Sequence, residues 1–238
     1  MSGKGKKAEN LNEKISIYSK RQLIIGENTA FFVKEEYKTI RTNILLSIPS
    51  EGCKIIGITS AEPNEGKSLN CLNLAITFAQ TEAKVLVIDC DLRIPNQARL
   101  MGMEAVPGLS NVLVGMNALD EIIRKTEFSN LDAVFAGDIP PNPSELLGSA
   151  NMAGVMGELS ARYDYIFVDL PPVNIVTDTM VMSKYLSGIV FVVRSGISKR
   201  DSVSEALGRL EMAKANILGI LLTGVTEKPR YAKKLAKK

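Results

Sequence analysis

Short apolar runs alternate along the chain with longer segments whose apolar residues recur at helical spacing. The runs predict buried strands; one begins at Lys54, and the others cover 85–88, 131–137, 165–169, 189–194 and 218–223. The segments between them predict helices over 33–46, 69–80, 144–162, 177–186 and 199–215, with short helical pieces in 107–126. Because parallel strands need crossover connections, this order predicts an α/β fold with a mainly parallel central sheet and helices on both faces.

The two ends of the chain differ in composition from its middle. Residues 1–30 are polar and weakly periodic, which predicts a flexible N-terminal arm with little core. Residues 31–226 suffice for one domain with a single core. Residues 227–238 form a basic tail, in which Lys or Arg occupies positions 228, 230, 233, 234, 237 and 238.

The composition excludes several kinds of site. With no histidine, the chain lacks the usual general base and the commonest transition-metal ligand. Its three cysteines show no C-x-x-C spacing and lie in apolar segments, which indicates reduced core residues of a cytosolic protein. The longest apolar runs, such as 188–193, are far shorter than the ~20 residues of a membrane span. We therefore expect a cytoplasmic chain that does not cross a bilayer. We also expect no nucleic-acid partner.

The segment from Lys54 to Ser68 predicts a strand, a tight loop and the first turn of a helix. Gly66-Lys67-Ser68 falls where the loop becomes helical, and backbone N–H groups there form a nest for an anion. In a P-loop the lysine reaches the β- and γ-phosphates and the serine ligates Mg²⁺. Ala61 breaks the strict pattern at its first position, and the alternative is that Gly66 merely caps a turn. The candidate nucleotide-binding residues are Pro63, Asn64, Glu65, Gly66, Lys67, Ser68 and Leu69.

Acidic residues end two of the predicted strands. Asp89 and Asp91 follow the strand 85–88, and Asp169 follows four apolar residues in the form of a Walker B strand. Ligands of open α/β sheets bind at the carboxyl ends of strands, so these carboxylates are candidates for metal and nucleophile handling. For Asp89 and Asp91 the alternative is a solvated turn. The Pro-rich loop 139–147, taken alone, indicates a structural role, with Ser144 placed to cap the helix that follows.

These features together resemble the catalytic domain of the bacterial tyrosine kinases (BY-kinases) that regulate capsular and exopolysaccharide synthesis. The resemblance extends from about Lys34 to Thr226 and identifies residues 31–226 as a P-loop NTPase-like kinase domain. It rests on five segments in family order: Glu35-x-x-Lys38-x-x-Arg41-Thr42-Asn43, Walker A at 60–68, Walker A′ at 85–93, IPPNPSELL at 139–147 and Walker B at 165–172. Partition and septum-placement ATPases are wider relatives, but Glu62 replaces their second signature lysine.

The resemblance implies a role for each candidate residue with ATP and Mg²⁺ as cofactors. Lys67 and the loop amides would hold the phosphates. Ser68, Asp89 and Asp169 would form the metal's inner or water-bridged shell. Asp91 would lie near the γ-phosphate, and either Asp89 or Asp91 would accept the tyrosine proton. Catalysis would then depend mostly on positioning and charge neutralisation.

The chain departs from the family pattern at several positions. Glu35, Lys38 and Arg41 correspond to a motif that joins subunits into a ring, but Lys38 replaces an arginine and lacks its bidentate fork. A solvated helix face with i,i+3 charge pairs is the alternative for this segment. Tyr231 alone follows Tyr185, where family members carry a tyrosine cluster, so either Tyr231 is the autophosphorylation target or the acceptor lies on another protein. Thr223 or a neighbour stands where an asparagine helps the family to read adenine.

We interpret the chain as an ATP-dependent protein-tyrosine kinase or autokinase that regulates polysaccharide synthesis and export. The resemblance implies a homo-oligomeric ring and a separate membrane-spanning activator, whose cytosolic tail would hold the chain at the inner face of the membrane. The basic tail would add attraction to anionic lipid or an acidic partner, or is simply a frayed helix. The alternatives are a partition-type switch ATPase and a nucleotide-binding scaffold without tyrosine kinase activity.

Overall fold

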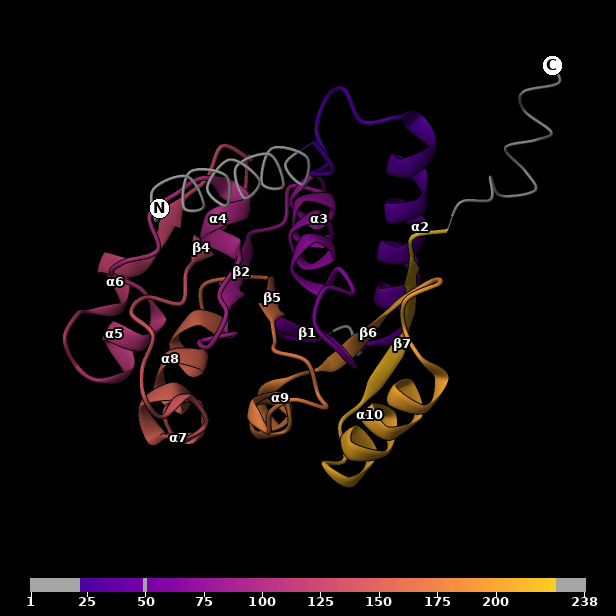
Figure 1. Cartoon of the computed structure of the whole chain (residues 1–238). Helices are drawn as coiled ribbons and strands as arrows, with labels where there is room; N and C mark the ends of the chain where they lie inside the picture. The colour runs from indigo at the N-terminus through magenta and orange to yellow at the C-terminus, as the bar shows by residue number, and fades with distance from the viewer. Residues whose placement is uncertain (1–21, 49–50, 226–238) are drawn as a thin grey trace, which may run out of the picture.

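The computed structural model describes residues 22–48 and 51–225. A seven-stranded sheet runs through it in the order β3-β4-β2-β5-β1-β6-β7 (Figure 1). Every pairing is parallel except that of β3 with β4, so the predicted α/β fold with a mainly parallel sheet is confirmed. The strands are β1 Lys54–Ser60, β2 Val85–Asp89, β3 Arg124–Lys125, β4 Leu131–Val134, β5 Tyr165–Asp169, β6 Gly188–Arg194 and β7 Ile217–Thr223.

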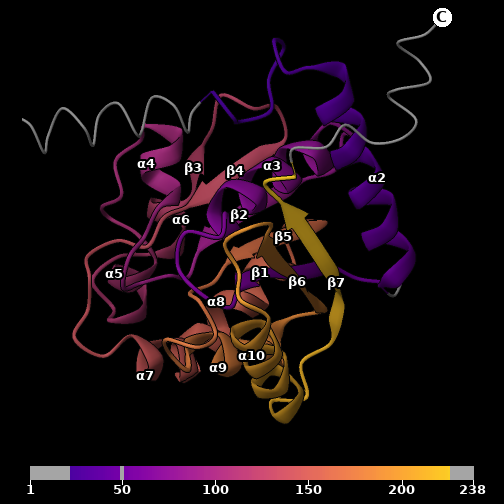
Figure 2. The ribbon, with the colours of Figure 1, turned by 45° about the vertical axis from the view of Figure 1, so that its right-hand side comes forward.

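Helices cover both faces of the sheet, as the two views in Figures 1 and 2 show. The helices are α2 Phe31–Ser47, α3 Lys67–Ala79, α4 Gln97–Met101, α5 Leu109–Leu113, α6 Leu119–Ile122, α7 Pro143–Gly148, α8 Ala150–Ser160, α9 Asp178–Met182 and α10 Arg200–Met212, with a 3-10 turn at Ser183–Tyr185. One core joins α2, α3 and α4 to the sheet, whereas α5 to α9 pack on the opposite face. A third cluster places α10 against β6.

Strand residues alternate between these cores because successive side chains leave a strand on opposite faces. Phe167 packs among the α2–α4 core, and its neighbours Ile166 and Val168 pack on the other face. All three are fully buried. A strand covered on both sides therefore has a continuous apolar sequence, which is the pattern that predicted the parallel sheet.

The predicted helix from Ser144 to Arg162 is wrong in two respects. The segment forms two helices, α7 and α8, and the cap of α8 is Ser149, whose hydroxyl accepts the Met152 N–H at 3.2 Å. Ser144 does not cap its helix, because its side chain bonds to Asp178 instead. Pro143 begins α7, where its missing N–H costs nothing.

Part of the predicted arm belongs to the core. Ile25 is 2% exposed, and its N–H donates to Asn73 Oδ1 at 2.9 Å, while Asn73 Nδ2 donates to the Leu23 carbonyl at 3.0 Å. The expectation of little core in residues 1–30 is therefore wrong at Ile25. The limits of the arm and of the tail 227–238 stay predictions.

Candidate functional site

The candidate site lies where the central parallel strands end. In the register of β2 and β5, Asp89 stands opposite Asp169, and in that of β1 and β5 the partner of Asp169 is Ile58. The loop that follows β1 leads directly into α3, which starts at Lys67. The fold thus brings the predicted P-loop and all three predicted acids to one edge of the sheet.

Gly66 makes the turn from loop to helix. It precedes α3 with φ +101°, a left-handed conformation that L side chains rarely adopt. A Cβ here would also lie 3.3 Å from Asn70 Nδ2, which donates to the Gly66 carbonyl at 2.8 Å. Both the backbone conformation and the limited space therefore favour glycine at this position.

Lys67 is the central cation of the site. Its Nζ donates to Asp91 Oδ2 at 2.7 Å and lies 3.5 Å from both Asp169 Oδ1 and Ser68 Oγ. The side chain is only 10% exposed. Burial alone would lower the pKa of Lys67, but Asp169 and Asp91 raise it above its ordinary value. The lysine therefore stays charged and next to two of the predicted carboxylates.

Asp89 and Asp169 are fully buried at adjacent strand ends. Burial, together with the neighbouring Asp169, raises the pKa of Asp89 to about 8, although the Gln97 backbone N–H acts in the opposite direction. Burial also raises the pKa of Asp169, and Lys67 partly offsets that shift. Negative charge is therefore costly here, and a further cation would relieve it.

The sequence analysis missed Gln97, which connects the parts of the site. Its Nε2 donates at 2.9 Å both to Asp169 Oδ2 and to the Ser68 carbonyl, and its backbone N–H donates to Asp89 Oδ2 at the same distance. It is fully buried at the start of α4. The signal for it was a polar residue at the beginning of a helix, eight positions after an acidic strand end.

The donor set fits a nucleotide-bound magnesium ion. Asp169 Oδ1 is buried and accepts no hydrogen bond in the structure, with Lys67 Nζ 3.5 Å away. Ser68 and the carboxylates supply hard oxygen ligands, which Mg²⁺ prefers. Within residues 22–48 and 51–225, no group of three or more acidic, histidine or cysteine side chains forms a metal cage. Mg²⁺ usually takes one or two carboxylates, with phosphate and water for the remainder.

The loop residues 62–65 are held by contacts with the ends of β6 and β7 and with the segment before α10. Glu65 is 1% exposed; its Oε2 accepts the Glu62 N–H at 3.0 Å, and its Oε1 accepts the Ser198 hydroxyl. The Glu65 carbonyl accepts the Thr223 hydroxyl at 3.2 Å, and the Asn64 carbonyl accepts from Arg194 at 2.9 Å. The side chain of Glu65 thus connects the backbone of the loop to Ser198.

The predicted subunit-contact residues lie on α2. Lys38 Nζ donates to Glu35 Oε1 at 2.7 Å on the surface, which is the i,i+3 pair of the alternative interpretation. Arg41 donates to the Thr77 carbonyl of α3 at 2.6 Å. Tyr231, the predicted autophosphorylation site, lies outside the described residues.

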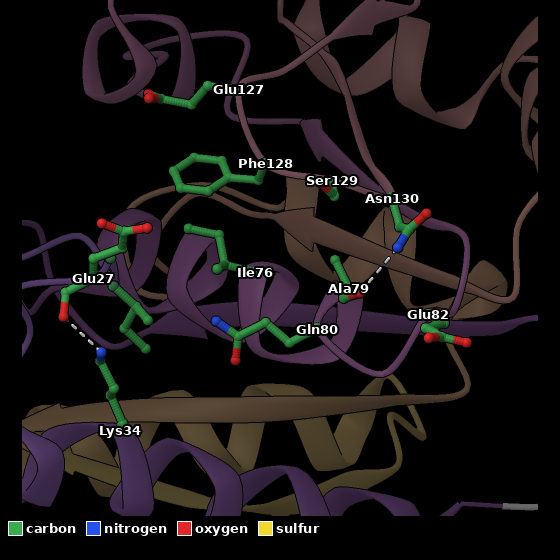
Figure 3. A pocket seen from close by; sticks show the side chains of 12 residues that line it. Glu27, Lys34, Ile76, Ala79, Gln80, Glu82, Glu127, Phe128, Ser129 and Asn130 are labelled. Atoms are coloured by element: carbon green, nitrogen blue, oxygen red, sulfur yellow. Dashed lines mark hydrogen bonds between the residues drawn. The ribbon is translucent and has the colours of Figure 1, made fainter.

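A hollow of about 660 Å³ opens at the other end of α3 (Figure 3). Its walls include Ile25, Gln80 and Phe128, and the close-up shows Asn130 reaching toward Ala79. None of the predicted phosphate or metal residues lines it. This hollow is therefore separate from the candidate site.

A buried lysine at a helix start, next to acids on neighbouring parallel strands, defines a nucleotide-binding protein of the P-loop class. A family model described as an AAA domain matches residues 53–193. The tyrosine-protein kinase YwqD of Bacillus subtilis is 37% identical over 190 residues, which cover 80% of each chain. The kinase domain of the Escherichia coli tyrosine kinase ETK superposes with a TM-score of 0.78 at 33% identity, covering 83% of this chain and 78% of that one.

The crystal structure of the chimerical protein CapA2B2 is also similar, with a TM-score of 0.76 and 37% identity over 79% of this chain and 83% of the other. The chain belongs to the bacterial tyrosine kinase family, as its five sequence segments predicted. It is a bacterial-type protein-tyrosine kinase domain. No helix in residues 22–48 or 51–225 is both long and apolar enough to span a membrane.

Proposed function

We propose that this chain transfers phosphate from ATP to tyrosine and thereby regulates capsular or exopolysaccharide synthesis and export. The observation that carries the proposal is the contact of Lys67 with Asp91 and Asp169 at the end of the P-loop. That arrangement places one cation and several hard oxygen donors where a triphosphate would enter. Family membership supports tyrosine, rather than water, as the acceptor of the phosphate.

Each site residue has a proposed role. Lys67 and the amides of residues 63–69 bind the phosphates, and Ser68, Asp89 and Asp169 hold Mg²⁺ directly or through water. The ion, when bound with ATP, neutralises charge on the β- and γ-phosphates. The contact of Asp91 with Lys67 supports a position for Asp91 close to the phosphate that is transferred. Gln97 keeps Asp89 and Asp169 in place.

The proposed partners follow the family resemblance. A separate membrane protein provides a cytosolic tail that activates the kinase and holds it at the inner face of the membrane. Subunits assemble as a ring through the α2 face with Glu35, Lys38 and Arg41. Tyr231 is the proposed acceptor within the tail.

The test is incubation of the full chain with Mg²⁺ and ATP, with and without tails of candidate membrane partners. Intact mass and anti-phosphotyrosine detection should show labelled tyrosine that disappears in Lys67→Ala. Tyr231→Phe should lower self-labelling, whereas Tyr18→Phe, at the other end of the chain, should not. ATP turnover without phosphotyrosine in any mixture would favour a switch ATPase instead.

A further inference from the structure

Three segments that are distant in sequence meet in one hydrogen-bonded group beside the candidate site. Arg93 Nε donates to Asp178 Oδ2 at 2.9 Å, and its NH2 donates to Asp178 Oδ1 at 3.1 Å. The same NH2 donates to Ser144 Oγ at 3.2 Å, and the Ser144 hydroxyl donates to Asp178 Oδ1. The group thus joins the turn after β2, the first turn of α7 and the start of α9.

The carboxylate in this group is fixed and needs its partner. The Asp178 side chain is fully buried, whereas that of Arg93 is 38% exposed. A bidentate arginine–carboxylate pair is strong and directional, and a buried carboxylate that loses its cation is left without compensation. The buried Asp178 therefore anchors the more exposed Arg93.

The base of that anchor is tied to the strand that leads into the P-loop. Thr179, next to Asp178, donates its hydroxyl to the Pro171 carbonyl at 2.8 Å. Thr59 of β1 donates its hydroxyl to the same carbonyl at 2.7 Å. Both threonines are fully buried. Asp178 is thus held in a constant relation to the end of β1.

Arg93 itself lies within the turn that positions the predicted catalytic acids. Asp91 Oδ1 accepts the Ile94 N–H at 3.0 Å, and Asp89 Oδ2 accepts the Asn96 N–H at 2.9 Å. These donors follow Arg93 by one and three residues. The path of the backbone at Arg93 therefore determines whether these N–H groups reach the carboxylates.

We infer that Arg93 is a positioning residue, which Asp178 and Ser144 hold so that the 89–97 turn keeps Asp91 against Lys67. The inference rests on the proposed function for its consequence in phosphoryl transfer, but not for its structural part. Arg93 acts through the turn and through Asp91, without contact with the reacting atoms. Loss of the pair lowers turnover more than it weakens ATP binding, since the anchor fixes the acids rather than the phosphate-binding amides.

The main test compares Arg93→Lys with the wild-type chain. Lysine keeps the charge but loses the bidentate fork, so the anchor loosens without removal of a cation. We expect kcat for tyrosine phosphorylation to fall about tenfold, with the KM for ATP changed less than about twofold. Arg209→Lys is the matched control, because Arg209 pairs with Glu205 on the exposed face of α10 at 2.7 Å.

Hydrogen–deuterium exchange of the nucleotide-free chain provides a readout that does not need kinase activity. Arg93→Lys and Asp178→Asn should both speed exchange in a peptide covering 89–97, and Arg209→Lys should leave it unchanged. Exchange and kcat equal to wild type in Arg93→Lys would overturn the inference. Faster exchange in a chain that never labels tyrosine would support the anchor and reject the proposed function. Uniformly faster exchange across the sheet would indicate a merely structural role and also overturn it.

The double variant Arg93→Lys/Asp178→Asn completes the test. If the two residues act as one anchor, the double variant should lose no more turnover than the worse single variant. If the fold-losses in kcat of the two single variants multiply in the double variant, Arg93 and Asp178 act independently. That result would reject the pair as the positioning unit. Ser144→Ala should give a smaller loss, of about threefold, because it removes one contact to each partner.

Discussion

Charged residues gather in two regions that differ in burial and in the definition of their geometry. At the strand ends, Lys67, Asp91 and Asp169 are nearly or fully buried, and Asp169 stands opposite Asp89 in the register of β2 and β5. On α2, the side chains of Lys38 and Glu35 are 47% and 39% exposed and pair only with each other among the contacts described here.

The difference shows where a charge motif determines structure. Interactions between exposed charges are weakened by water and salt, and such pairs contribute ~0–1 kcal/mol. A buried charge without a partner costs several times more, so the strand-end group must keep its geometry. The charged residues of α2 therefore need a partner surface to fix their geometry, whereas those at the strand ends form a site within one chain.

The strongest way to break this contrast is to remove the cation of the buried group. Lys67→Ala leaves two buried carboxylates, Asp91 and Asp169, without their cation. It should destabilise the chain by about 3–5 kcal/mol, with at least ~100-fold weaker ATP binding. Urea unfolding and nucleotide titration measure the two effects. Arg209→Ala is the matched control, because Arg209 also pairs with an acid, Glu205, at 2.7 Å, but both side chains are exposed, by 39% and 57%.

The control should change stability by less than about 1 kcal/mol and leave ATP binding intact. Similar losses in Lys67→Ala and Arg209→Ala would remove the distinction between buried and exposed charge. Intact ATP affinity in Lys67→Ala would instead disprove the P-loop assignment.

A second prediction concerns the acids rather than the lysine. The pKa of Asp89 rises from 3.8 to about 8 on folding, so the folded chain binds more protons than the unfolded chain between these values. Stability from this group is thus fully present below pH 3.8 and is lost as the pH rises through about 8. The unfolding free energy of the nucleotide-free chain should fall between pH 5 and 8, by up to ~1.4 kcal/mol per pH unit.

Asp89→Asn should flatten that slope, because the substituted group no longer titrates. Asp201→Asn on the exposed first turn of α10 is the control and should keep the wild-type slope. Urea titrations at a series of pH values measure the effect. A wild-type curve that is level from pH 5 to 8 would contradict the assigned pKa.

The sequence was sufficient to predict the main fold, because a strand that is buried on both faces has a continuous apolar sequence. A parallel strand such as β5 is covered by helices on both faces, so Ile166, Phe167 and Val168 are all apolar. Carboxyl ends of parallel strands lie at one edge, so the acids that follow them were expected together. The edge strand β3 has only Arg124 and Lys125, which carry no apolar pattern, and it was missed.

Contacts between distant segments were beyond what the sequence pattern contains. Ser144 satisfies the local rule for a helix cap, but Asp178, 34 residues away, takes its hydroxyl. Gln97 has no periodic neighbour that marks it as part of a site, since its partners Asp169 and Ser68 lie 72 and 29 residues away. For Ser144, a tertiary hydrogen bond outweighed the local preference for a helix cap. For Gln97, the order of the strands in the sheet brings its distant partners together.

The smallest expected effect on stability comes from α2, and it sharpens the comparison from the exposed side. Lys38→Ala should change the unfolding free energy by less than about 0.5 kcal/mol, since it removes only the surface pair with Glu35. Lys38→Arg restores a bidentate fork. If α2 joins subunits, sedimentation velocity should show larger assemblies for Lys38→Arg than for wild type at equal concentration, and smaller ones for Lys38→Ala. Identical distributions for all three chains would remove this residue from the subunit contact and leave the pair as a solvated helix face.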